Sequence, residues 1–102
     1  MRIVNRKVEL VDDGDEQFLY MWCPGCEQVH GITVCGPGAW QWNRSQSRPT
    51  IQPPILFRDP TGGYRCHSVI QDGHWQFLTD CTHALAGSIV EMSDWPPPRT
   101  DW

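Results

Sequence analysis

The stretch Cys23-Pro24-Gly25-Cys26, followed by His30, decides how this sequence is interpreted. Two thiols three positions apart, bent around a Pro-Gly turn, can converge on one cation without help from distant residues. They supply at most half of a tetrahedral zinc shell, so other parts of the chain must supply the rest. The sequence offers further donors at Cys66-His67 and at Cys81-Thr82-His83. We therefore expect a small domain organised around Zn2+.

Local geometry narrows the choice of ligands. Cys66 and His67 are adjacent, and neighbours on a strand point to opposite faces, so we expect only one of them to bind. Cys81 and His83 diverge by roughly 200° on a regular helix, so both can bind only where the chain is extended or turning. Because sites built on this motif are usually completed by sulfur, the predicted shell is Cys23, Cys26, Cys66 and Cys81.

Three histidines are left near this predicted shell. His30, His67 and His83 are expected either as alternative ligands or as groups that hydrogen-bond to the ligands. Other interpretations stay open: a zinc site with a free position for catalysis, a thiol redox pair, thiol chemistry at Cys81 beside a histidine, or no metal.

Composition and charge limit the function classes. The chain has 102 residues, a formal net charge of −4, and 8 basic against 12 acidic side chains. It lacks the clustered positive charge of nonspecific nucleic-acid binding, which argues against a nucleic-acid partner. No apolar run is long enough to cross a bilayer, and no signal-peptide apolar region follows the N-terminus. We therefore expect a cytosolic protein, in which five cysteines favour a metal over disulfides.

The hydrophobic pattern predicts a mainly β protein, a small α+β fold. The Cys23–Cys26 turn lies between two short apolar segments, which is typical of a zinc-knuckle hairpin. Asp72-Gly73 is the clearest hairpin signal in the chain. Strands are expected over 3–11, 18–22, 31–35, 55–57, 64–71, 74–78 and 88–92.

One helix, one domain and a tail complete the predicted organisation. Asp80 can cap a short helix over residues 80–86, and Gly87 can end it. Residues 1–94 are expected to form a single zinc-stabilised β-rich domain. Residues 95–102 are rich in proline and tryptophan and are expected to be an extended tail.

Six tryptophans are many for a chain of this length. In Trp40-Gln41-Trp42-Asn43 the two indoles would share one face of an extended segment. Trp40, Trp42 and Asn43 are therefore candidate binding residues, and packing of the two indoles into the core is the alternative.

A set of motifs in a fixed order extends over roughly residues 18–92. They are the Cys23–Cys26 turn with His30, Trp42-Asn43, Pro49-Thr50, Pro53-Pro54-Ile55, Cys66-His67-Ser68, Asp72-Gly73, Gln76-Phe77-Leu78 and the run from Asp80 to Gly87. This order resembles the DUF6527 family of small phage and prophage proteins. The resemblance implies a phage or bacterial-cytosolic setting and a metal site, but no reaction. The label ammonia monooxygenase, which such proteins often carry, requires a large membrane assembly that this chain cannot form.

No catalytic motif accompanies the predicted metal site. The sequence has no phosphate-binding glycine loop, no Gly-x-Ser-x-Gly elbow and no HExxH. We therefore predict a zinc-binding phage accessory protein that acts through a protein partner, directed at a host or defence factor. The alternative is a small zinc-dependent hydrolase with water on the metal and Asp80, His67 or His83 as the base.

Overall fold

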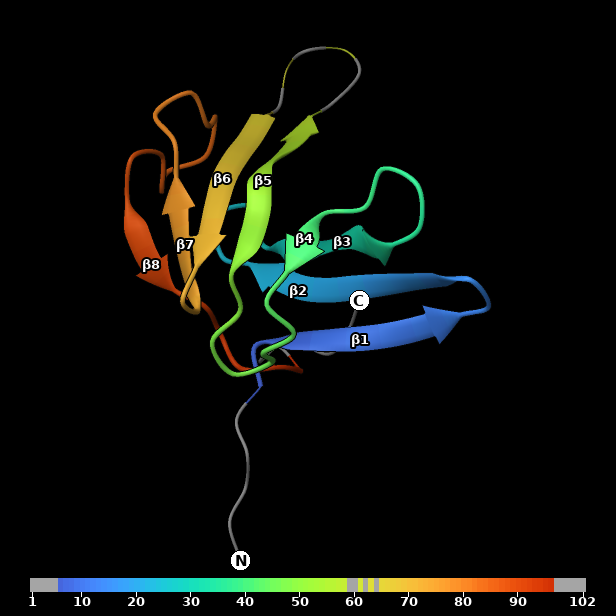
Figure 1. Cartoon of the computed structure of the whole chain (residues 1–102). Helices are drawn as coiled ribbons and strands as arrows, with labels where there is room; N and C mark the ends of the chain where they lie inside the picture. Colours follow the sequence, from blue (N-terminus) through green and yellow to red (C-terminus); the bar gives the residue numbers. More distant parts are fainter. Residues whose placement is uncertain (1–5, 59–60, 62, 64, 97–102) are drawn as a thin grey trace, which may run out of the picture.

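The computed structural model describes residues 6–58, 61, 63 and 65–96 and contains two antiparallel sheets whose strands cross steeply (Figure 1). The three-stranded sheet has the order β1 (Val8–Asp13), β2 (Glu16–Cys23), β3 (Gln28–Cys35). The five-stranded sheet has the order β4 (Gln41–Trp42), β5 (Ile51–Arg58), β6 (Arg65–Gln71), β7 (His74–Phe77), β8 (Ile89–Glu91). The prediction of a mainly β fold is confirmed.

One face of each sheet forms the core. On β6, the buried side chains of Cys66, Ser68 and Ile70 alternate with the half-buried side chains of His67 and Val69. The same period of two places buried residues of both sheets in one cluster. Its members include Val8, Leu19, Met21 and Ile32 from the three-stranded sheet and Ile51, Ile55, Ile70, Trp75 and Phe77 from the five-stranded sheet.

The β6–β7 hairpin forms where the sequence predicted it. Asp72 and Gly73 have positive φ angles of 52° and 77°, which suit a two-residue turn of type I′. Gln71 and His74 flank the turn as directly paired residues. The turn therefore fixes the register that places alternate residues of β6 on opposite faces.

The helix predicted over residues 80–86 is wrong: this segment is a series of turns. The N–H of Thr82 donates to the carbonyl of Arg65 (2.9 Å), which attaches the start of this segment to β6. The N–H of Gly87 likewise donates to the carbonyl of Phe77 (2.9 Å). Backbone bonds to β6 and β7 therefore replace the i to i−4 bonds of a helix.

The predicted tail begins packed against the three-stranded sheet. The backbone N–H of Trp95 donates to the carbonyl of Arg6 (2.7 Å), and its indole N–H donates to Glu9. Trp95 lines a cavity of about 270 Å3 with Glu9, Val11, Tyr20 and Val29. Residues 97–102 of the tail and residues 3–5 of the predicted first strand lie outside the described residues. Within the described residues, no helix of a length and apolarity suited to crossing a membrane is present.

The turn segment over residues 78–88 packs on the Cys23–Cys26 turn through His83. The His83 ring meets the ring of Phe77 edge-on, with 4.6 Å between centroids. A Cβ atom added at Gly25 would come within 2.5 Å of both ring nitrogens of His83. Gly25 is thus required here because the imidazole occupies the space of a side chain.

Replacing Gly25 by alanine should lower the free energy of unfolding by about 1–3 kcal/mol, the usual cost of overpacking. Gly63→Ala is the matched control, because a Cβ there meets only Thr61 Oγ1, at 3.8 Å, and should change stability by less than about 0.5 kcal/mol. Denaturant midpoints measure both. Equal midpoints for the two variants would contradict the packing of His83 on Gly25.

Candidate functional site

Four side chains from both sheets converge in the core. Cys23 ends β2, Cys26 lies in the following turn, His30 is on β3 and Cys66 is on β6. One ligand atom from each lies within 4.8 Å of the others. The Sγ atoms of Cys23 and Cys66 are 3.9 Å apart, and a tetrahedral site with metal–sulfur bonds of about 2.3 Å has edges of about 3.8 Å. This cluster could hold a metal ion.

The Cys23–Cys26 turn is held in a knuckle conformation by its backbone. The N–H of Cys26 donates to the Sγ of Cys23 (3.4 Å), and the N–H of Glu27 donates to the carbonyl of Cys23 (2.8 Å). Glu27 closes the turn with a positive φ of 56°. Such N–H donors stabilise a thiolate, which is the form that binds a metal.

His30 fits the cluster as a ligand. Its side chain is 4% exposed, and its ring stacks on Phe57 with 3.8 Å between centroids. Its Nε2 atom is buried and has no hydrogen-bond partner among the described residues. A buried imidazole nitrogen without a partner is costly, and a cation among the three sulfur atoms would supply one.

The thiols of Cys23 and Cys66 both have raised pKa values when no cation is present. A hydrogen bond with the side chain of Cys26, joined by burial, raises the pKa of Cys23 to about 12, although its bond with Cys66 acts in the opposite direction. Hydrogen bonds with Cys23 and Cys26, followed by burial, raise the pKa of the Cys66 thiol above its ordinary value. Metal binding here must therefore displace thiol protons.

Cys81 and His83 form a second group with Cys66. The Sγ of Cys81 accepts a bond from the N–H of His67 (3.3 Å) and donates to the carbonyl of the same residue (3.2 Å). The Nδ1 of His83 accepts from the N–H of Leu85 (3.2 Å). The predicted shell is thus divided: Cys23, Cys26 and Cys66 meet His30, whereas Cys81 lies beside Cys66 and His83.

His67 lies in neither group and points to the opposite face of β6 from Cys66. We call this face, defined by Leu56, His67, Gln76 and Ile89, the outer face of the five-stranded sheet. The Nδ1 of His67 lies 3.2 Å from Oδ2 of Asp80.

A cavity of about 520 Å3 adjoins the His67–Asp80 pair. Its walls are His67, Gln76, Phe77, Leu78, Thr79, Asp80, Gly87 and Ile89. Burial alone would raise the pKa of Asp80, but the hydrogen bond and charge of His67, a backbone hydrogen bond and the charge of Arg65 lower it below its ordinary value. The cavity therefore has an ionised carboxylate and an imidazole at its edge.

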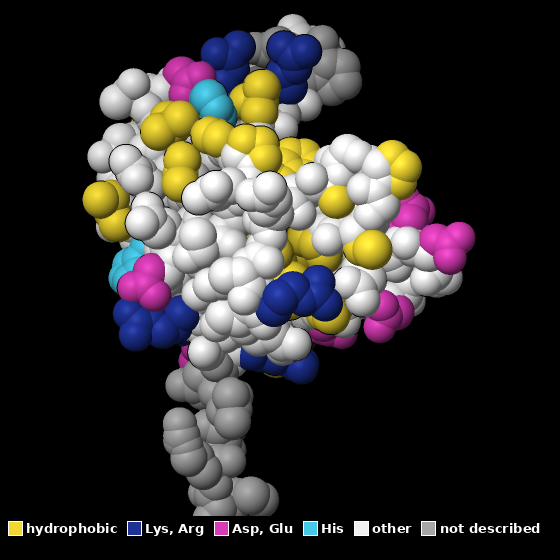
Figure 2. All heavy atoms as spheres, in the orientation of Figure 1, with side chains coloured by type: hydrophobic (Ala, Val, Ile, Leu, Met, Phe, Trp, Pro, Cys, Tyr) yellow, Lys and Arg dark blue, Asp and Glu magenta, His cyan; other side chains and the backbone are white. Residues whose placement is uncertain are grey.

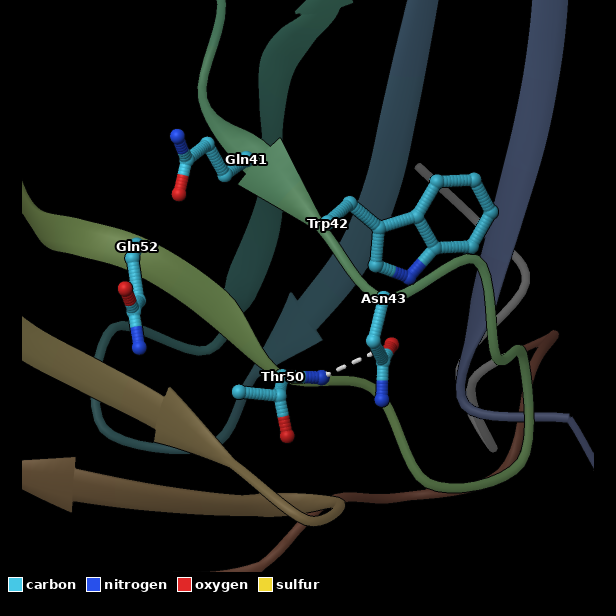
Figure 3. Close-up of a pocket in the computed structure, with 5 residues that line it drawn as sticks. All are labelled: Gln41, Trp42, Asn43, Thr50 and Gln52. Atoms are coloured by element: carbon cyan, nitrogen blue, oxygen red, sulfur yellow. Dashed lines mark hydrogen bonds between the residues drawn. The ribbon is translucent and has the colours of Figure 1, made fainter.

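The residues predicted for binding lie at a smaller cavity of about 250 Å3 (Figure 3). Trp42 and Asn43 line it with Gln41, Thr50 and Gln52, whereas Trp40 packs against the core. Oδ1 of Asn43 accepts from the N–H groups of Ser45 and Thr50 (3.1 Å each). These bonds hold the loop before β5, and the role of Trp40, Trp42 and Asn43 in binding stays a prediction.

Arg65 is the residue near His67 that the sequence analysis did not identify. Its Nη1 lies 3.4 Å from Oδ2 of Asp80, the oxygen that also contacts His67. Its position two residues before His67 on one strand is the signal that places both on the same face.

Replacing His67 by alanine should raise the pKa of Asp80 toward its ordinary value of about 3.9, because His67 is the main cause that lowers it. Arg65→Ala should raise it less. The lowered pKa means that the pair stabilises the fold above about pH 4 and that this contribution is lost as pH falls through the folded-state pKa. Carboxyl-carbon NMR titrations measure the shift. An unchanged Asp80 pKa in the His67 variant would contradict the pairing.

Comparison with known protein families gives a match to part of the chain. A family model described as "Bacterial ubiquitination-like system serine protease (BubE)" matches residues 1–78, while comparison with curated proteins and with solved structures finds no match. The matched range contains the four-residue cluster and His67 and ends before Asp80, Cys81 and His83. The resemblance to DUF6527 is not tested by this match and stays a prediction. Because the match covers more than half of the chain, the chain belongs to the BubE family.

Proposed function

We propose that this chain is a zinc-stabilised binding protein of a bacterial ubiquitination-like system. It engages a protein partner over the outer face of the five-stranded sheet and forms no acyl-enzyme. The family description supports the setting. The distribution of serines supports binding over covalent catalysis, and it is the observation that carries this proposal.

The metal in this proposal is zinc with a structural role. Three cysteines and one histidine are a common donor set of structural zinc sites. All four positions of a tetrahedral shell are filled by Cys23, Cys26, His30 and Cys66, which leaves no position for a reactive water. This argues for support of the fold and against the alternative of a hydrolase with an open metal site.

A serine protease needs a serine hydroxyl within reach of its base. The chain has five serines, and none lines the cavity beside His67. Ser68 is next to His67 in sequence, but it points to the opposite face of β6 and is 0% exposed. Ser88 is opposite Phe77, whose side chain faces the core, so Ser88 is turned the same way. Ser45, Ser47 and Ser93 lie in loops away from this cavity.

Hydrolysis by an activated water is the second candidate function. It is favoured by the contact of Asp80 with Nδ1 of His67, which leaves Nε2 to take a proton from water. In this reaction His67 removes the proton as the water oxygen attacks the peptide carbonyl, and the proton passes to the leaving amine. Thr79 is the one hydroxyl side chain among the residues that line the cavity.

Elemental analysis should find one zinc ion per chain, and chelation should abolish cooperative unfolding, because the cluster joins the two sheets. Cys66→Ser should lose the metal, whereas Cys35→Ser should keep it, because Cys35 is exposed and belongs to neither ligand group. Zinc affinity should rise with pH, because binding displaces protons from thiols whose pKa values are raised. A zinc-loaded, fully stable Cys66 variant would contradict the structural site.

A fluorophosphonate probe should leave the zinc-loaded protein unlabelled, as followed by intact-mass spectrometry.

Calorimetry with a ubiquitin-like protein of such a system should show binding that falls at least about tenfold in Ile89→Asp, which places a charge on the outer face. Gln46→Asp is the control, because it adds the same charge at an exposed position of the loop before β5, away from both cavities. Probe labelling of a serine, or equal affinity of the two variants, would refute binding without acylation at this face. Cleaved product that depends on His67 would favour the second candidate.

A further inference from the structure

Two arginines lie directly opposite each other at one end of the outer face. Arg58 ends β5, Arg65 begins β6, and the two are paired in the register. Leu56 and His67 are paired two positions along, so the arginine side chains lie on the same face as His67. Both arginines are exposed. Like charges in this position repel, and a bound anion would remove that cost.

The described residues at this end carry a positive charge although the chain is acidic. Oδ2 of Asp80 is shared between Nη1 of Arg65 (3.4 Å) and Nδ1 of His67 (3.2 Å). Among the described residues, Arg58 has no ion-pair partner; Asp59 follows it in sequence but lies outside them. Among the described residues at this end, the Asp80 carboxylate therefore contacts one of the two guanidinium groups, that of Arg65, on a chain whose net charge is −4. Figure 2 shows basic side chains gathered at this end of the molecule.

The surface beside the arginines is apolar. Leu56 is 45% exposed, Ile89 is 69% exposed, and the half-buried Leu78 forms part of the cavity wall. An inorganic phosphate bound to the arginines would leave these apolar side chains exposed to water. The negative net charge of the protein argues against nucleic acid as the ligand. A carboxylate attached to apolar groups satisfies both parts of the surface, because a guanidinium binds a carboxylate in a bidentate geometry.

We infer that Arg58 and Arg65 bind the C-terminal carboxylate of a partner polypeptide whose last side chains cover the cavity beside His67. This inference rests on the proposed function, since it names the chemical group by which the partner is held. Asp80 orients Arg65 for this contact, and exposed Leu56 and Ile89 contact the apolar side chains.

Two matched peptides test the inference: acetyl-leucyl-leucyl-glycine with a free carboxylate and the same peptide as its C-terminal amide. NMR titration of the zinc-loaded protein should give at least about tenfold weaker binding for the amide, since a charge-assisted bond is lost. The Arg58→Gln and Arg65→Gln substitutions should each weaken binding of the acid peptide to a similar extent. Arg44→Gln should not, because its guanidinium lies over the Trp42 ring instead.

Equal binding of acid and amide peptides, or no binding of either, overturns the inference. Inorganic phosphate that binds as tightly as the acid peptide also overturns it, because the apolar surface would then contribute nothing. Arg58→Gln should not lower the denaturant midpoint, since it removes repulsion, so lost binding cannot be attributed to unfolding. If the ubiquitin-like protein still loses affinity in Ile89→Asp, the proposed function stands even where the carboxylate contact fails.

Discussion

The convergence of Cys23, Cys26 and His30 with Cys66 is the contact on which the rest of the structure depends. Three of these side chains come from the three-stranded sheet and its turn, and one comes from the five-stranded sheet. A domain of 102 residues has a modest core, so a metal ion held by this cluster across the two sheets would have a large effect on its stability. Removing it would leave the sheets joined by apolar packing and by contacts at their edges, such as the ion pair of Lys7 with Glu91 on β8 (3.7 Å).

Strand β6 connects this centre to the molecular surface. Cys66 and Ser68 face the core, whereas Arg65 and His67 face outward, because successive side chains alternate. The thiol of Cys81 bonds to both backbone polar groups of His67 and so fixes the strand at this point. The position of the outward histidine is thus determined by the same strand that supplies the central cysteine.

Local sequence patterns were sufficient to predict the hairpins, but they were insufficient to predict the cluster of four residues that could ligate a metal. Asp72-Gly73 encodes its turn through two positive φ angles, and the Cys23–Cys26 spacing encodes half of the donor set. The choice between His30 and Cys81 depends on how the two sheets pack, which no local pattern contains. The helix expected after Asp80 failed for the same reason, because Thr82 bonds to Arg65 across the sheet. The pairing of His67 with Asp80 also needs this long-range contact.

The bond between Trp95 and Arg6 brings the two ends of the described domain to one place. The chain enters β1 and leaves after β8 at the same corner, where Lys7 also pairs with Asp94 (2.8 Å). A domain closed in this way can be inserted into a loop of another protein, or circularly permuted, with little distortion of either sheet. A connection to another polypeptide would therefore need to involve only this one corner of the domain.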